Sequence, residues 1–126
     1  MLVLIVDDNY MNIKITQKML DKLEVESDFA MSGFECLKKT QENRYNMIFM
    51  DIMMPGMDGI ETLNNLQMID GFETPVIALT ADVYSGAKEK YLELGFEEYI
   101  EKPINIDYLK FILDKYNQDE ILKLKK

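Results

Sequence analysis

Short apolar runs alternate with segments of helical periodicity along the chain, and this alternation constrains the fold more than any other feature. The runs indicate five strands, at residues 2–6, 25–30, 47–50, 76–79 and 98–100. Strands that alternate with helices through short connections form a parallel sheet covered by helices on both faces. A helical bundle would leave the β-branched residues of the first and fourth runs unexplained. The sequence therefore predicts a doubly wound α/β domain.

The segments between the runs carry helix signals of their own. Apolar residues recur every four positions and predict one apolar face of the first helix, at Met11, Ile15, Met19 and Leu23. Ser32 and Glu35 form a capping-box pattern at the start of the second helix. Capping side chains precede the third and fifth helices and a glycine is placed to end the fourth, at Asp58, Asn105 and Gly95 respectively.

The chain is acidic and contains no histidine. Its 126 residues include 23 Asp or Glu against 14 Lys or Arg, a formal net charge of −9. This charge argues against nucleic acid, because phosphate backbones are bound by Lys and Arg. Without histidine the chain has no Ser-His-Asp or Cys-His catalytic set and no His-ligated zinc, and it cannot carry a phosphohistidine. The only cysteine, Cys36, excludes an intrachain disulfide and suits a reducing cytosol.

Length predicts a single domain over 1–126. Its core is expected at about 2–116, and the polar, Lys-rich tail at 117–126 is expected to extend the last helix or fray. The apolar run at the N-terminus is shorter than a secretory signal, and no segment approaches the ~20 apolar residues that span a bilayer. We therefore expect a soluble cytoplasmic domain that makes no membrane contact.

Polar side chains stand where four of the five predicted strands end: Asp7 and Asp8, Asp51, Thr80, and Lys102. In open α/β sheets the carboxyl ends of the strands form the ligand-binding edge. Carboxylates gathered there repel one another unless one is protonated or a cation binds them. Oxygen ligands with room for water favour Mg²⁺, or Mn²⁺ in its place.

Lys102 and Thr80 add a positive charge and a hydroxyl donor to this predicted cluster. A carboxylate nucleophile beside a hard cation, an ammonium group and a hydroxyl can carry out phosphoryl transfer, because the cations neutralise the phosphoryl oxygens while the carboxylate attacks. The sequence therefore points to phosphoryl chemistry at this edge.

The chain resembles the response-regulator receiver domain of two-component signalling over residues 2 to about 116. The motifs that carry the resemblance are Val6-Asp7-Asp8, the segment Met50 to Gly59, Ala78-Leu79-Thr80-Ala81, and Lys102-Pro103. The resemblance implies a flavodoxin-like sheet of five strands in the order 2-1-3-4-5 with five helices. It also implies a phosphorylation-dependent switch or relay that depends on Mg²⁺.

The resemblance also implies residue roles. Asp51 would be the phosphoacceptor and would bind Mg²⁺ directly, together with Asp8 and the backbone carbonyl of Met53. Asp7 would act on the metal largely through bound water.

On the phosphoryl side, Lys102 would pair with one phosphoryl oxygen and Thr80 would hydrogen-bond another. Tyr99 would be the aromatic that turns inward as Thr80 shifts, and the peptide bond between Lys102 and Pro103 would be cis. Met53 and Asp82 stand where the family modulates phosphoryl lifetime; we expect Met53 to shield the acyl phosphate and Asp82 to orient water.

The resemblance implies partners as well. A histidine kinase or a histidine phosphotransfer domain would donate the phosphoryl group. A downstream effector, or a second copy of the chain, would bind the face around residues 84–116, which includes Tyr84, Tyr91 and Tyr108. The segment Asp8-Asn9-Tyr10-Met11-Asn12 resembles the Asp-Asn-x-x-Asn start that is common in receivers attached to hybrid sensor kinases, so we favour an excised fragment over a stand-alone regulator. Such a domain promotes its own phosphorylation and dephosphorylation without being a dedicated enzyme.

Three alternatives belong to other classes. A Mg²⁺-dependent aspartyl phosphatase would need a second acid two residues after Asp51, where Met53 stands. A flavodoxin-like electron carrier would need a small-residue phosphate loop in place of Asp7-Asp8-Asn9. A non-phosphorylated interaction module would have no need of the complete acceptor set.

Overall fold

The computed structural model describes the backbone of residues 1–124 and the side chains of residues 1–117. One parallel sheet has the strand order β2-β1-β3-β4-β5 and is made of β1 Leu2–Val6, β2 Glu26–Ala30, β3 Met47–Asp51, β4 Val76–Thr80 and β5 Glu98–Glu101. The helices are α1 Tyr10–Lys22, α2 Gly33–Glu42, α3 Gly59–Gln67, α4 Ala87–Leu94 and α5 Ile106–Leu124. The predicted fold and strand order are confirmed.

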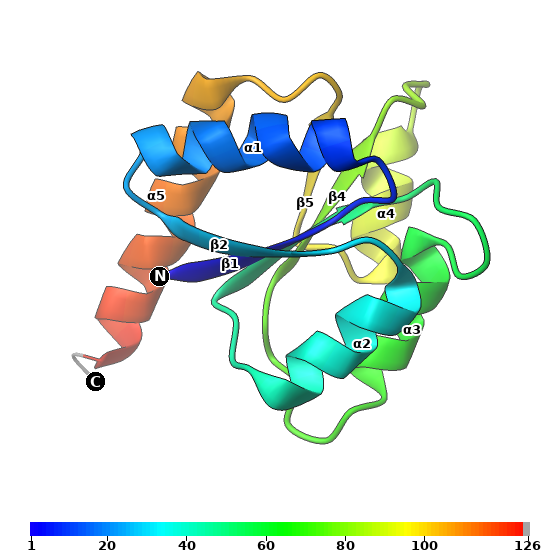
Figure 1. Ribbon diagram of the computed structural model, residues 1–126, viewed down its shortest axis with the longest axis horizontal. Helices are drawn as coiled ribbons and strands as arrows, with labels where there is room; N and C mark the ends of the chain where they lie inside the picture. The colour runs from blue at the N-terminus through cyan, green and yellow to red at the C-terminus, as the bar shows by residue number, and fades with distance from the viewer. Residues whose placement is uncertain (125–126) are drawn as a thin grey trace.

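The sheet is covered on both faces, with α1 and α5 on one side and α2, α3 and α4 on the other (Figure 1). Successive residues of β1 serve the two sides in turn, because side chains alternate along a strand. Val3 and Ile5 pack in the cluster with α1 and α5, whereas Leu4 and Val6 pack in the cluster with the other three helices. This explains why the central strands β1, β3 and β4 are nearly continuous apolar runs rather than alternating ones.

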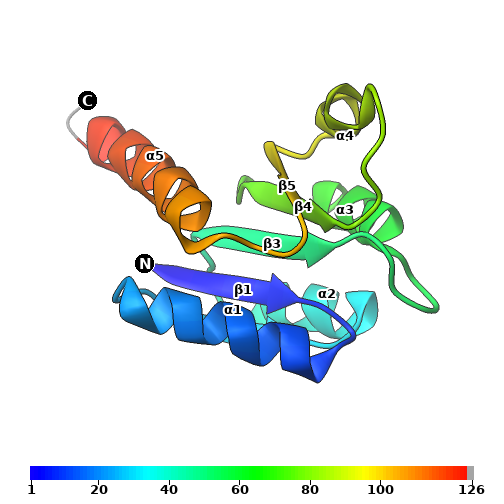
Figure 2. The ribbon, with the colours of Figure 1, turned by 90° about the horizontal axis from the view of Figure 1, so that it is seen from above.

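The carboxyl ends of the paired strands β1, β3, β4 and β5 lie at one edge of the sheet. β1 pairs with β3 in parallel from Val3↔Met47 to Val6↔Met50, and Figure 2 shows the two strands side by side and pointing the same way. The pairing continues through β3 with β4 to Asp51↔Leu79, and through β4 with β5 to Thr80↔Glu101. All of these strands therefore end at the same edge.

The predicted helix boundaries are confirmed by the caps. Side-chain oxygens accept hydrogen bonds from the first-turn N–H groups of α2, α3 and α5, at Ser32, Asp58 and Asn105, and Gly95 ends α4 with φ of 113°. Only half of the capping box forms: the Glu35 carboxylate accepts from the N–H of Met31 at 3.4 Å rather than from Ser32. The last helix continues through Leu124, and residues 125–126 of the predicted tail lie outside the described part.

The first helix confirms half of the predicted apolar face and corrects the other half. Met19 and Leu23 are partly buried and pack against the core, whereas Met11 and Ile15 are 66% and 50% exposed. The fully buried residues of α1 are Ile13, Thr16 and Leu20. A four-residue repeat drifts by about 40° per step around a helix of 3.6 residues per turn, so it does not stay on one face. The sequence pattern therefore identified the helix but not the side that faces the sheet.

Gly59 brings the start of α3 against the end of β3. A Cβ atom there would meet the carbonyl oxygen of Asp51 and would lie 2.9 Å from Cα of Ile52, while the Gly59 N–H donates to the Ile52 carbonyl at 2.9 Å. We predict that Gly59→Ala lowers the free energy of unfolding by about 1–3 kcal/mol, because backbone cannot yield as a side chain can.

Urea denaturation measures this cost. Asn64→Ala, on the exposed face of the same helix, is the control and should stay within about 0.5 kcal/mol of wild type. Equal stabilities of the two variants would contradict the close-packing role of Gly59.

Candidate functional site

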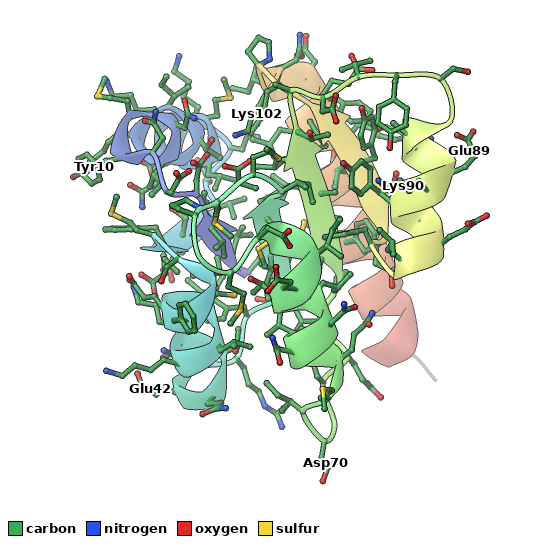
Figure 3. All side chains as sticks on the ribbon, turned by 90° about the vertical axis from the view of Figure 1, so that its right-hand side faces the viewer. Tyr10, Glu42, Asp70, Glu89, Lys90 and Lys102 are labelled. Carbon is green, nitrogen blue, oxygen red and sulfur yellow. The ribbon has the colours of Figure 1, made fainter. Side chains whose placement is uncertain are left out.

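Backbone hydrogen bonds continue beyond the strands and hold the polar residues at the sheet edge. The N–H of Asp7 donates to the Ala30 carbonyl at 3.1 Å, and the N–H of Lys102 donates to the Thr80 carbonyl at 2.9 Å. These bonds extend the ladders β1–β2 and β4–β5 by one residue each. Figure 3 shows Lys102 beyond the carboxyl end of β4. Asp7 and Lys102 are therefore placed by the sheet itself.

Three carboxylates gather at this edge. Oxygen atoms of Asp7, Asp8 and Asp51 lie within 4.8 Å of one another. Asp7 and Asp51 are buried, whereas Asp8 is exposed and leaves one side of the group open to water. Carboxylate oxygens with space for water match the donors that Mg²⁺ and Mn²⁺ take. The residues present therefore fit a hard divalent cation.

Lys102 is the ammonium group that faces these acids. Its Nζ lies 3.0 Å from Oδ1 of Asp51 and 3.4 Å from Oδ2 of Asp7. Burial lowers the pKa of Lys102, but the hydrogen bond and charge of Asp51, joined by those of Asp7, outweigh it and hold the pKa above its ordinary value. Lys102 therefore keeps its charge within the site.

Asp51 is an unusually basic carboxylate. Burial raises its pKa to about 6; the hydrogen bond from Lys102 opposes this rise, and the negative charge of Asp7 adds to it. The N–H of Met53 also donates to the Asp51 carboxylate and favours its charged form. A carboxylate held in this way binds protons, metal ions and electrophiles more readily than a solvated one.

Thr80 and Tyr99 lie on neighbouring strands β4 and β5. Thr80 is buried, and its hydroxyl accepts from the N–H of Asp82 at 3.0 Å. Tyr99 is only 8% exposed, and its hydroxyl donates to the carbonyl of Asp82 at 3.4 Å. Both hydroxyls therefore hydrogen-bond the backbone of Asp82 at the start of the loop after β4. The Tyr99 side chain is already buried in the protein interior.

The remaining predicted residues flank the cluster. The Met53 side chain is 73% exposed, and Asp82 is exposed at the start of the loop between β4 and α4. The peptide bond between Lys102 and Pro103 is cis, the isomer that the resemblance implies.

Two contributors escaped sequence reasoning. The N–H of Asn9 donates to Oδ1 of Asp7 at 2.9 Å, while its side chain caps α1, so one residue orients the acid and starts the helix. An Asn directly after two acids and before a helix could have indicated this. Tyr91, expected on an exposed face, is instead buried against Tyr99, and its helical spacing alone could not reveal that contact.

The chain matches the model of the response regulator receiver domain over residues 3–114. It therefore belongs to the receiver-domain family and is a receiver domain of two-component phosphorelay signalling. None of the described helices is both long and apolar enough to cross a membrane.

Similar proteins include histidine kinases. Hybrid signal transduction histidine kinase G of Dictyostelium discoideum is 36% identical over 118 residues, and histidine-protein kinase BarA of Escherichia coli K12 is 36% identical over 117 residues. The alignments cover 90% and 92% of this chain but only 3% and 13% of those proteins. The chain thus spans a small part of their length.

Solved structures of receivers are similar in fold. The receiver domain of Francisella response regulator 1452 has a TM-score of 0.87 at 29% identity, covering 94% of this chain and 98% of that one. The receiver domain of sensor histidine kinase PA1611 from Pseudomonas aeruginosa PAO1 has a TM-score of 0.82 at 28% identity, covering 91% and 95%. The latter structure has a magnesium ion coordinated in its active site cleft.

The raised pKa of Asp51 predicts a pH-dependent stability. The folded state holds this proton up to about pH 6, whereas the ordinary value is 3.8, so ionisation destabilises the fold as pH rises through that window. Asp51→Asn should therefore stabilise the metal-free protein at pH 7.5 by about 1–2 kcal/mol. This gain is smaller than the free energy equivalent to the whole pKa shift, because the substitution also removes the ion pair with Lys102.

Thermal unfolding in EDTA at pH 7.5 and pH 4 measures this effect. The advantage of Asp51→Asn should shrink at pH 4, where the wild-type carboxyl is protonated. Asp70→Asn, at the opposite end of the molecule from Lys102 (Figure 3), is the control. A constant advantage of Asp51→Asn at both pH values would contradict the assignment.

Proposed function

We propose that Asp51 accepts a phosphoryl group from a phosphohistidine on a partner kinase or histidine phosphotransfer domain. The observation that carries this proposal is the buried Asp51 carboxylate held 3.0 Å from Lys102 inside a group of three acids. Its raised pKa makes it the more basic oxygen nucleophile. The absence of histidine requires the donor to lie outside this chain.

Asp8, Asp51 and the backbone carbonyl of Met53 would hold Mg²⁺ directly, with Asp7 acting through water. The bound ion supplies positive charge that neutralises the phosphoryl oxygens. Asp7, which is buried and pairs with Lys102 at 3.4 Å, keeps that ammonium group at the mouth of the site.

In the transfer step, a carboxylate oxygen of Asp51 attacks the phosphorus atom and a P–O bond forms. The P–N bond to the imidazole breaks, its electron pair remains on nitrogen, and the ring then takes up a proton from water. Lys102 pairs with a phosphoryl oxygen, and Thr80 donates its hydroxyl proton to another. The new group adds about 1.5–2 negative charges, which draws both residues toward it.

Two surfaces would serve the partners. Met11 and Ile15, exposed on α1 just after Asp8, offer the phosphohistidine domain an apolar surface beside the acids. A cavity of about 430 Å³ lies among α4, β5 and the start of α5, and Tyr84 and Tyr108 are among its lining residues. The downstream effector would bind at this cavity within the face around residues 84–116, with a second copy of the chain as the alternative occupant.

The relatives support a proposal for the parent molecule. Since they are histidine kinases that extend far beyond this domain, we favour a receiver fragment, residues 1–126, of a histidine kinase over a stand-alone regulator. The cell compartment would then be the cytoplasm. The aspartyl phosphatase alternative is disfavoured because the exposed thioether of Met53 stands where its second acid is needed.

Phosphorylation of Asp51 can be tested directly. Incubation with acetyl phosphate and Mg²⁺ should add one phosphoryl group, seen by intact mass, because a small donor needs no partner surface. EDTA should abolish the adduct, and Asp51→Asn should not form it. Asp70→Asn should be modified as wild type is. An adduct that persists on Asp51→Asn would overturn the proposal.

The lifetime roles give a further prediction. Met53→Asn should speed loss of the phosphoryl group about threefold to tenfold, because a polar side chain replaces the shield and admits water. Asp82→Asn should slow it. Met68, another exposed methionine outside the site, supplies the control Met68→Asn. The rate of phosphate release measures hydrolysis of the acyl phosphate. A rate for Met53→Asn equal to that of wild type would argue against shielding by Met53.

A further inference from the structure

The helix α1 differs in charge from the rest of this acidic chain. Its basic residues are Lys14, Lys18 and Lys22, and its only acid is Asp21. In each of the other helices, as far as Leu124, acids equal or outnumber basic residues. On a chain with a formal net charge of −9, α1 is therefore the helix that presents positive charge.

The lysines of α1 share the exposed face with its two exposed apolar residues. At about 100° per residue, Lys18 and Lys22 lie about 20° to either side of Met11 around the helix axis. The buried Leu20 lies on the opposite side, and Ile15 is exposed beside Lys22. Figure 2 shows α1 along an outer side of the molecule, with its start next to the carboxyl end of β1. The face is thus open to a partner.

Lys18 and Lys22 are not engaged by their own domain. Both side chains are exposed, and none of the ion pairs among residues 1–117 includes either ammonium group. Lys14 differs, because its Nζ lies over the ring of Tyr10, 5.2 Å from the centroid. Two positive charges of this face are therefore available to groups on another molecule.

The apolar and basic parts of the face lie at different distances from the site. The acids of the site lie beyond the start of α1, where Asp8 directly precedes the cap Asn9. Lys18 and Lys22 lie about 10 and 16 Å further along the axis than Met11, at 1.5 Å per residue. Charges are largely screened beyond about 8 Å at physiological ionic strength. An acidic group would therefore be repelled at the start of α1 and attracted two to three turns further on.

We propose that Lys18 and Lys22 select phosphohistidine partners that carry acidic side chains two to three helical turns from the histidine. The inference rests on the proposed function, in which such a partner reaches Asp51. The partner's surface next to the histidine contacts Met11 and Ile15, and its acids pair with the two lysines. Opposite charges arranged in this way raise the association rate and fix the orientation of the partner.

Phosphoryl transfer from two matched donors tests the proposal on the full chain. One donor is a histidine phosphotransfer domain with Glu two to three turns from its histidine on the same helix; the other carries Gln at those positions. Phosphoramidate phosphorylates both. At low salt the second-order rate constant of transfer should be about tenfold higher from the Glu donor. High salt should bring the two rate constants together, because it screens exposed charges.

Charge reversal on the receiver gives the reciprocal test. Lys18→Glu with Lys22→Glu should abolish the preference for the Glu donor, and a donor with Lys at those positions should restore fast transfer. Lys18→Gln with Lys22→Gln, which adds no negative charge to the helix, should also abolish the preference.

The control is Lys38→Glu with Arg44→Glu. These exposed residues lie on α2 and in the loop that follows it, and their reversal changes the net charge by the same amount. This variant should keep the preference for the Glu donor. Acetyl phosphate should label Asp51 equally in wild type and in all of these variants, because a small donor needs no contact with α1.

The outcomes are distinct. Equal transfer from the Glu and Gln donors at low salt, transfer from neither donor, or equal losses in the two charge-reversed variants would overturn the role of Lys18 and Lys22 while leaving Asp51 as acceptor. Failure of acetyl phosphate to label the wild type would overturn the proposed function, and this inference with it. Binding of wild type to phosphatidylserine vesicles, lost in Lys18→Glu with Lys22→Glu, would assign the face to a lipid surface instead.

Discussion

The crowding of carboxylates around one ammonium group is the constraint on which the site depends. Asp7 and Asp51 are buried together, and both lie within 3.4 Å of Lys102, so one positive charge serves two acids. Burial, with the negative charge of Asp7 added, raises the pKa of Asp51 to about 6 against the opposing hydrogen bond from Lys102, and leaves the carboxylate ready to bind a proton or a cation. Because Lys102 is anchored through the Thr80 carbonyl, the charge balance is tied to the sheet edge.

That edge could be predicted from sequence because strand ends are marked by a change from apolar to polar residues. Asp7, Asp51 and Thr80 each follow a short apolar run, and the carboxyl ends of parallel strands lie at one edge. Helix boundaries were also predictable, since caps such as Ser32 and Asp58 act locally within one turn. These features depend on a few neighbouring residues, and a single sequence shows them.

Features that depend on packing between distant elements could not be predicted in this way. The apolar residues Met11 and Ile15 face solvent, while the polar Thr16 is buried because its hydroxyl donates to the Asn12 carbonyl at 3.0 Å. Tyr91 is likewise buried against the ring of Tyr99 on β5, a contact that the sequence of its own helix does not reveal. Periodicity identifies a helix, but the neighbours select the face that is buried.

The acidic, histidine-free composition bears on how the site would be charged and phosphorylated. Under the proposed function, Asp51 would need a donor on another molecule or domain, and the charge that arrives with the phosphoryl group would have to be met by groups that are already engaged. Lys102 is shared with Asp7, and the Thr80 hydroxyl oxygen accepts from the N–H of Asp82. If Lys102 turned to a phosphoryl group, it would have to leave Asp7, so an event at the end of β3 would disturb the end of β1. The scarcity of positive charge at the sheet edge would thus couple the site to its surroundings.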